Sequence, residues 1–130
     1  MRYLVDTDWV IHYLNGRPDV VAHIQNLEPD TLAISVITVA ELYEGVYYSR
    51  DPRKAEEGLR DFLRGVGLLG IDEATARIFG RERGRLRALR KSIGDFDLLI
   101  GATALSLGYS VLTANPRHFR HVPGLAVTQL

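Results

Sequence analysis

Hydrophobic and polar positions along the chain follow two periods, one typical of short buried strands and the other of amphipathic helices. Uninterrupted runs of β-branched, aliphatic and aromatic residues predict buried strands. Apolar residues three and four positions apart, such as Val39, Leu42 and Val46, predict helices that bury one face. Strands are expected at 3–5, 31–36, 66–71 and 110–113, with a short fifth at 125–127. Helices are expected at 9–14, 17–27, 38–48, from 51–52 onward, at 72–91, and from 95–96 to 108.

Residues that end helices or start them separate these segments. Asn15-Gly16 stops the first helix, Pro52 starts a later one, and Gly108 suits the left-handed residue that closes the last one. Strands that alternate with helices predict parallel βαβ units. We therefore expect an α/β fold, a three-layer α/β/α sandwich around a central parallel sheet of four to five strands, in a single domain that spans 1–130.

Composition narrows the class of protein. A chain of 130 residues with 46% hydrophobic and 25% charged residues is ordinary for a globular domain, which excludes disordered and collagen-like chains. The absence of cysteine excludes disulfide scaffolds, thiolate nucleophiles and Cys-ligated zinc. The acid Asp6 falls too early for the apolar core of a signal peptide, and the stretch 98–112 is too polar to span a membrane. We expect a cytoplasmic protein without a membrane segment.

Polar side chains stand where a parallel sheet would bring them to one edge. One acid follows the first strand, one lies in the first turn of the helix after the second strand, and two open the helix before the fourth strand. A threonine and an asparagine stand at the end of the fourth strand, and ligands bind beyond the carboxyl ends of such sheets. The candidate site residues are Asp6, Glu41, Asp95, Asp97, Thr113 and Asn115.

Clustered carboxylates need compensation. Two of them about 5 Å apart repel by roughly 3 kcal/mol at an effective dielectric near 20. A fold keeps such a cluster when some members are protonated or when a cation neutralises them. Because the donors are oxygens, with no cysteine and no well-placed histidine, the pattern favours Mg²⁺ or Mn²⁺ over zinc.

Several of these acids also have a purely structural interpretation. Thr38 and Glu41 have the spacing of a capping box, in which Glu41 would bond the Thr38 amide. Asp95 fits the N-cap of its helix. Asp6 lacks such a role if Asp8 caps the helix that follows it. The conjunction of acids at predicted strand ends favours a metal site.

Four blocks of sequence occur in order along nearly the whole chain: LVDTD at 4–8, SVITVAEL at 35–42, GDFDLLIGATA at 94–104 and VLTANPRHF at 111–119. They resemble PIN-domain ribonucleases, and most closely the VapC-type toxins of bacterial and archaeal toxin–antitoxin pairs. The resemblance implies an endoribonuclease that depends on Mg²⁺, with Mn²⁺ as a substitute. It also implies inhibition by a cognate antitoxin, and usually a homodimer.

Carried over by position, the resemblance implies that Asp6, Glu41 and Asp97 bind the metal and that Thr113 helps to shape the site. The implied reaction is hydrolysis by a metal-activated water, which leaves a 5′-phosphate and a 3′-hydroxyl. Either Glu41 or Asp95 would orient or deprotonate that water, and the sequence does not separate them.

The chain departs from the common family pattern at three positions. Asp8 stands where asparagine is frequent, Asn115 occupies a position that is acidic in some members, and His118 replaces a common acid. Asn115 removes a charge that would help to hold a second ion. The number of metal ions therefore stays open.

Arginines dominate the predicted helix 72–91. Seven basic side chains between 77 and 91 accompany one acid, Glu82. Part of this helix is expected to contact RNA phosphates, although a solvated face around a core stripe at Ile78, Leu86 and Leu89 would give the same pattern. The candidate RNA contacts are Arg83, Arg87 and Arg90.

Two other functions remain open at this stage. In an aspartate-nucleophile phosphatase, Asp6 would attack phosphorus and Asp8 would act as the acid, which leaves Glu41 without a role. A catalytically inactive PIN-like binding module would keep the fold and lose the reaction. Metal-dependent RNA cleavage, or a trapped phospho-aspartate, separates these alternatives.

Overall fold

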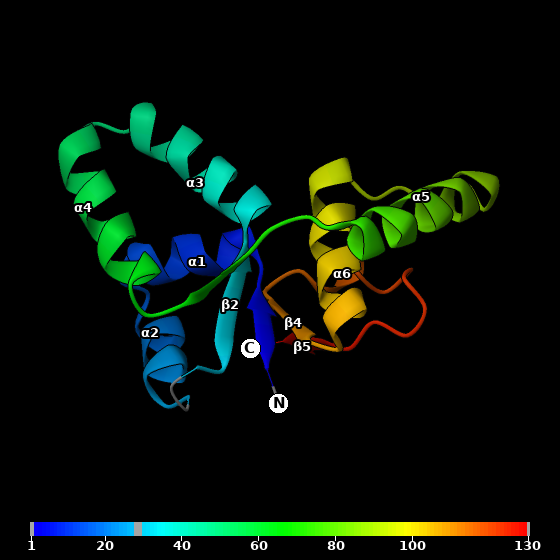
Figure 1. The fold of residues 1–130 in the computed structure, drawn as a ribbon. Coiled ribbons are helices and arrows are strands. Elements are labelled where there is room, and N and C mark those ends of the chain that lie inside the picture. The colour runs from blue at the N-terminus through cyan, green and yellow to red at the C-terminus, as the bar shows by residue number, and fades with distance from the viewer. Residues whose placement is uncertain (1, 28–29, 130) are drawn as a thin grey trace.

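The computed structural model describes residues 2–27 and 30–129 (Figure 1). The strands are β1 (Tyr3–Val5), β2 (Leu32–Ser35), β3 (Gly67–Leu69), β4 (Ser110–Thr113) and β5 (Val127–Gln129). The helices are α1 (Thr7–Leu14), α2 (Pro18–Gln25), α3 (Val36–Tyr47), α4 (Pro52–Leu63), α5 (Glu73–Ala88) and α6 (Asp95–Leu107), followed by a 3₁₀ turn, η1 (Pro116–His118).

The strands form one parallel sheet with the order β3-β2-β1-β4-β5. In the centre, Leu4 of β1 lies opposite Ala33 of β2 and Val111 of β4. Because all the strands run the same way, the residues that follow β1, β2 and β4 emerge at the same edge of the sheet. The expected α/β fold with a central parallel sheet is confirmed.

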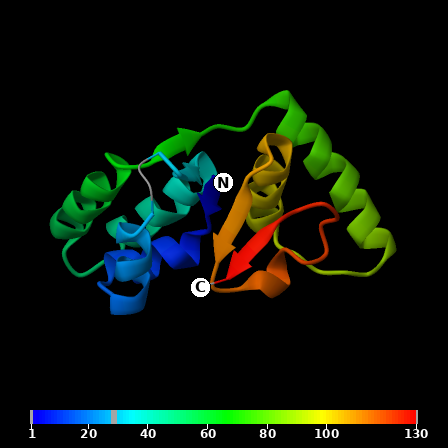
Figure 2. The same cartoon turned by 90° about the horizontal axis from the view of Figure 1, so that it is seen from below.

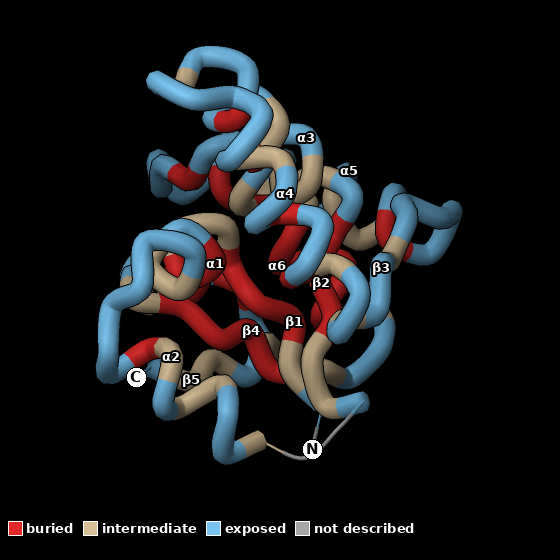
Figure 3. The backbone as a smooth tube through the Cα atoms, turned by 90° about the vertical axis from the view of Figure 1, so that its left-hand side faces the viewer, coloured by how far each residue is buried: buried red, intermediate tan, exposed pale blue. Residues whose placement is uncertain are grey.

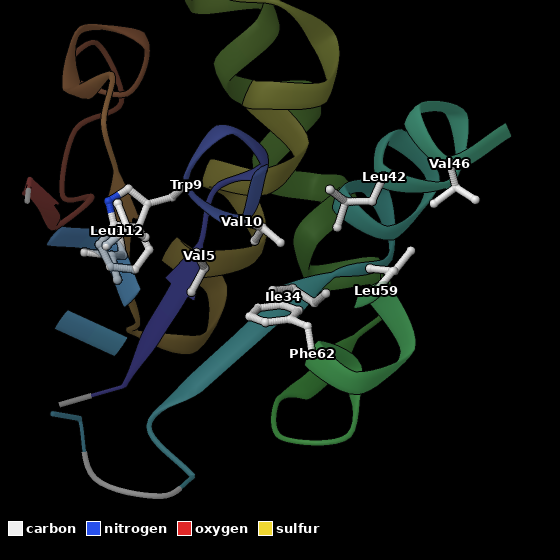
Figure 4. Packing of buried hydrophobic residues seen from close by; sticks show 10 residues of the cluster. Val5, Trp9, Val10, Ile34, Leu42, Val46, Leu59, Phe62 and Leu112 are labelled. Atoms are coloured by element: carbon white, nitrogen blue, oxygen red, sulfur yellow. The ribbon is translucent and has the colours of Figure 1, made fainter. Parts of the chain in front are cut away.

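The sheet lies between two helical layers (Figures 1 and 2), and alternate residues of its strands pack against one layer or the other. Val5, Ile34 and Leu112 point to one face, where they pack with side chains of α1, α2, α3 and α4. Figure 4 shows this cluster gathered between the sheet and the helices. Leu4 and Val111 point to the opposite face and pack against α6. α5 in turn packs on α6, where Leu86 and Leu98 belong to one buried cluster.

Burial follows the position of each strand in the sheet (Figure 3). The inner strand β4 is buried along its whole length, whereas Gly67 and Leu68 on the edge strand β3 are exposed. Within residues 2–27 and 30–129, no helix combines the length and the apolar character that crossing a membrane requires.

Three elements start two residues away from the predicted position, and the other starts agree to within one residue. α1 begins at Thr7, so Asp6 and not Asp8 is its N-cap. α3 begins two residues before Thr38, because the Ser35 hydroxyl accepts a hydrogen bond from the Ile37 amide and caps the helix there. The last strand, β5, also starts later in the sequence than predicted.

β5 pairs with β4 from Val127 onward and not from Leu125. The preceding turn explains this shift, since Gly124 has a φ of +81° and the Leu125 amide donates to the Val122 carbonyl. The Leu125 side chain is used in the core instead, where it lies against Gly101.

Candidate active site

Asp6 joins the ends of two neighbouring strands. It follows β1 directly and only 4% of it is exposed. Its Oδ1 accepts a hydrogen bond from the Thr7 amide at 2.8 Å, and its Oδ2 accepts one from Thr113 Oγ1 at 2.9 Å. Thr113 Oγ1 also accepts from the Asn115 amide at 2.9 Å, which orders the chain beyond β4. The predicted contribution of Thr113 to this site is therefore a direct contact with Asp6.

The surroundings of Asp6 disfavour its negative charge. Burial is the main cause that raises the pKa of Asp6 to about 7. The negative charges of Asp8 and Asp97 act in the same direction, whereas the hydrogen bond from Thr113 lowers the pKa. Protonated Asp6 also donates a hydrogen bond to Asp8, and because the ionised form cannot do so, this bond raises the pKa of Asp6 further. Near neutral pH this carboxyl is therefore poised to take up either a proton or a cation.

Asp8 lies in the first turn of α1, not at the cap that the sequence suggested. Its Oδ2 accepts a hydrogen bond from Asn115 Nδ2 at 3.1 Å. Its Oδ1 is buried and has no hydrogen-bond partner among the described residues. Sequence reasoning missed the role of Asp8 in this site, although the Asp-x-Asp spacing after β1 was a usable signal.

Asp97 reaches the same group of acids from α6. It is in the first turn of that helix, and its Oδ2 lies 2.9 Å from His118 Nδ1 of η1. Burial raises the pKa of Asp97, the neighbouring His118 lowers it, and the charge of Asp8 raises it. The acids Asp6, Asp8 and Asp97 thus interact electrostatically, as expected for side chains at one edge of a parallel sheet.

Glu41 approaches from α3 through Thr7, the neighbour of Asp6. Thr7 Oγ1 donates to Glu41 Oε1 at 2.7 Å and lies 3.0 Å from the hydroxyl of Thr38. The capping-box interpretation is wrong, because Glu41 bonds a side chain of α1 and Thr38 lies inside α3. One oxygen of Glu41 is therefore fixed beside the acids at the sheet edge.

Asp95 has a different partner from the other candidate acids. Gly94 is the N-cap of α6, so the prediction that Asp95 caps this helix is wrong. Its Oδ1 lies 2.6 Å from Arg83 NH2, and Arg83 NH1 donates to the Ile93 carbonyl at 3.1 Å. Arg83, a predicted RNA contact, thus ties α5 to the start of α6.

The acids at the sheet edge carry the oxygen donors that a divalent cation such as Mg²⁺ prefers. Among the described residues, no three Asp, Glu or His side chains stand so that they could hold a metal ion together. Mg²⁺ is nevertheless commonly held by one or two carboxylates while it keeps several waters. The unpartnered Oδ1 of Asp8 and the raised pKa of Asp6 both mark a place where a positive charge is missing. The acids Asp6, Asp8 and Asp97 therefore offer the oxygen donors for a hard cation that one or two carboxylates hold and that water otherwise surrounds.

A groove of about 600 Å³ opens beside Glu41, between α1, α3 and α4. Its floor is largely apolar, with Ile11, Leu14 and Leu42 among the lining residues, and Lys54 lies along it. The groove is therefore suited to an apolar side chain or helix face next to the acids.

Comparison with known proteins agrees with the fold. The PIN domain family model matches residues 3–125. The chain is 33% identical to "Ribonuclease VapC2" of Haemophilus influenzae over 96% of its own length and 95% of that protein. It is 30% identical to the "tRNA(fMet)-specific endonuclease VapC" of Shigella flexneri, with the same coverage. The chain belongs to the PIN-domain family, among the VapC ribonucleases.

Solved structures give the same result. The crystal structure of VapBC2 from Rickettsia felis, bound to a DNA fragment from their promoter, contains a chain that superposes with a TM-score of 0.93. The match covers 100% of this chain and 99% of that one, at 27% identity.

Proposed function

We propose that this chain is a Mg²⁺-dependent endoribonuclease that hydrolyses RNA in the cytoplasm as the toxin of a toxin–antitoxin pair, with Mn²⁺ as a substitute ion. One observation carries the proposal. A buried carboxyl with its pKa raised to about 7, Asp6, lies with other acids at the edge of the sheet, in a chain of the VapC ribonucleases.

A bound divalent cation supplies a water of lowered pKa and a positive charge for the phosphoryl oxygens. Asp6 and Asp97 are the residues that we expect to hold it. Thr113 fixes one oxygen of Asp6, and Thr7 fixes one oxygen of Glu41 and so sets the direction of the other. Glu41 then orients the attacking water and takes its proton, a role for which Asp95 is less suited because it pairs with Arg83. The 3′-oxygen leaves, so that the products carry a 5′-phosphate and a 3′-hydroxyl.

The phosphatase alternative fits the geometry less well. A nucleophilic aspartate needs an accessible oxygen aimed at phosphorus. Asp6 is only 4% exposed, and both of its oxygens accept hydrogen bonds. Glu41, linked to the site by Thr7, also has no part in that reaction.

The test is cleavage of a labelled RNA by the purified chain with Mg²⁺, with Mn²⁺ and with EDTA. We expect cleavage with either ion, none with EDTA, and products with 5′-phosphate ends. Asp97→Asn should lower the rate by at least about a hundredfold, because a metal contributes several kcal/mol to the transition state. Undiminished cleavage in EDTA, or 2′,3′-cyclic phosphate products, would contradict the proposal, and a folded chain without cleavage would support the inactive module.

An antitoxin is the partner that the family suggests, and the solved relative is a VapBC pair. We propose that the antitoxin covers the apolar groove beside Glu41 and thereby blocks the acids. Replacing Leu14 at the groove by Asp should weaken the complex with the co-expressed antitoxin while RNA cleavage persists. A second copy of the chain is proposed as a further partner, which sedimentation of the antitoxin-free protein checks.

A further inference from the structure

We propose that Asp8 is a direct ligand of the divalent cation in this site, and that Asn115 is the positioning residue that turns its carboxylate toward the ion. The inference rests on the proposed metal-dependent function and extends the ligand set that the sequence suggested, which contained Asp6, Glu41 and Asp97 but not Asp8.

The first argument is the unsatisfied oxygen of Asp8. Its Oδ1 is buried and accepts no hydrogen bond from the described residues while Asp6 is ionised. A buried polar group without a partner is unfavourable, and more so when it is charged. A fold tolerates such an oxygen where a ligand completes it. For a carboxylate the matching ligand is a cation.

The second argument is how firmly the other oxygen is held. Asn115 Nδ2 donates to Asp8 Oδ2 at 3.1 Å, and the Asn115 amide donates to Thr113 Oγ1 at 2.9 Å. Thr113 in turn donates to Asp6 Oδ2. This connected series of hydrogen bonds fixes the two carboxylates relative to each other across β1 and β4, as the outer partners of metal ligands commonly do.

The third argument is the choice between Asp8 and Glu41 as the next ligand. The charge of Asp8 raises the pKa of both Asp6 and Asp97, so Asp8 interacts with each of these acids. Glu41 instead has one carboxylate oxygen, Oε1, engaged by the hydrogen bond from Thr7 Oγ1. A cation next to Asp8 would therefore relieve repulsion from both neighbours, while Glu41 stays available to orient water.

Direct titration with Mn²⁺, followed by electron paramagnetic resonance, tests the proposal without reference to activity. Asp8→Asn should weaken Mn²⁺ binding by at least about tenfold, the effect expected even for a second-layer partner of a metal ligand. Asp6→Asn is the positive control. Asp19→Asn is the matched control, since Asp19 is an exposed acid paired with Arg17 on α2. Urea unfolding in EDTA verifies that each variant is folded.

A double-mutant cycle isolates the role of Asn115. Asn115→Ala should weaken Mn²⁺ binding when Asp8 is present and should have no further effect in the Asp8→Asn background. Additive effects would overturn the positioning role. Unchanged Mn²⁺ affinity of Asp8→Asn, while Asp6→Asn loses binding, would overturn the assignment of Asp8 alone. A wild-type chain that neither binds Mn²⁺ nor cleaves RNA would overturn the proposed function itself.

Discussion

Two buried carboxylates of this protein have opposite electrostatic surroundings. Asp6 at the end of β1 is 4% exposed and faces other acids at the sheet edge. Glu82 on α5 is 3% exposed and lies between two guanidinium groups, with Arg81 Nε 3.0 Å from one oxygen and Arg85 Nε 2.8 Å from the other. Burial disfavours both charges, but the protein itself compensates only that of Glu82.

The difference separates a structural acid from a functional one. The guanidinium of Arg85 also donates to the His121 carbonyl, so the Glu82 cluster ties α5 to the segment before β5. The groups that set the pKa of Asp6 among the described residues are acids and a hydroxyl, and burial beside those acids raises this pKa. A buried acid that is stabilised by its own chain supports the fold, whereas one that awaits a cation supports chemistry.

The largest expected effect is that of Asp6→Asn on RNA cleavage. The rate should fall by about a thousandfold, or about 4 kcal/mol of transition-state stabilisation, because a metal ligand is lost. The free energy of unfolding in EDTA at pH 8 should instead rise, since an uncompensated buried charge is removed. Cleavage kinetics and urea unfolding measure the two effects. A fall in both quantities would place Asp6 in the same structural class as Glu82.

The pH dependence of stability comes next in size. The pKa of Asp6 is about 7 in the folded chain and about 3.9 in an unfolded one, so the folded state binds this proton more tightly. Its stabilisation is complete below pH 4 and is lost as the pH rises through 7, by at most about 4 kcal/mol. Urea unfolding in EDTA between pH 4 and pH 8 measures this loss. The profile of Asp6→Asn should be flatter, and Mg²⁺ should restore stability at pH 8; identical profiles for the two proteins would contradict the assignment.

Glu82→Gln should have a smaller effect, and of the opposite kind. We expect the free energy of unfolding to fall by about 1–3 kcal/mol, since two guanidinium groups lose their charged partner but remain partly in solvent. Cleavage per folded molecule should stay unchanged. Glu73→Gln, which breaks the exposed pair with Arg77, is the control and should shift stability by less than about 0.5 kcal/mol. Loss of cleavage in folded Glu82→Gln would remove the distinction between the two acids.

The sheet edge around Asp6 and the contacts of α5 around Glu82 also differ in how much of their structure the sequence predicts. The limits of β1, β4 and α6 follow from apolar runs and from Gly108, whose φ of +70° closes the helix as expected. The convergence of Asp6 and Asp97 follows from parallel topology alone. Local patterns were sufficient wherever neighbouring residues decide the structure.

Local sequence patterns did not predict the contacts between segments that are distant along the chain. The hydrogen bond between Asp8 and Asn115 joins residues 107 positions apart, so the local spacing made Asp8 look like a helix cap. Thr38 and Glu41 looked like a capping box because Ser35, which actually caps α3, has the same chemistry three residues earlier. The sequence also could not show that Arg83 would be used by Asp95 and Ile93.

The smallest expected effect concerns Arg87 in the last turn of α5 and Arg90 just beyond that helix. Arg87 and Arg90 are exposed, and neither takes part in an ion pair of the described residues, whereas the Arg83 side chain is only 15% exposed and is paired with Asp95. If Arg87 and Arg90 contact RNA phosphates, replacing both by Gln should make the plot of log binding constant against log salt concentration less steep. The expected reduction in slope is about 1.4, or about 0.7 per contact. Binding is measured in the cleavage-deficient Asp6→Asn background.

Arg77→Gln provides the matched control, because Arg77 is also an exposed arginine, on α5, but is already paired with Glu73. Its slope should stay close to that of the parent protein. A slope that is also unchanged in the Arg87/Arg90 variant would mean that α5 presents a solvated basic face and that its charges serve mainly to hold Glu82 and Asp95. A lower slope for the Arg87/Arg90 variant than for Arg77→Gln would instead mean that RNA binds at the C-terminal end of this basic segment, whereas the other arginines of α5 serve the fold.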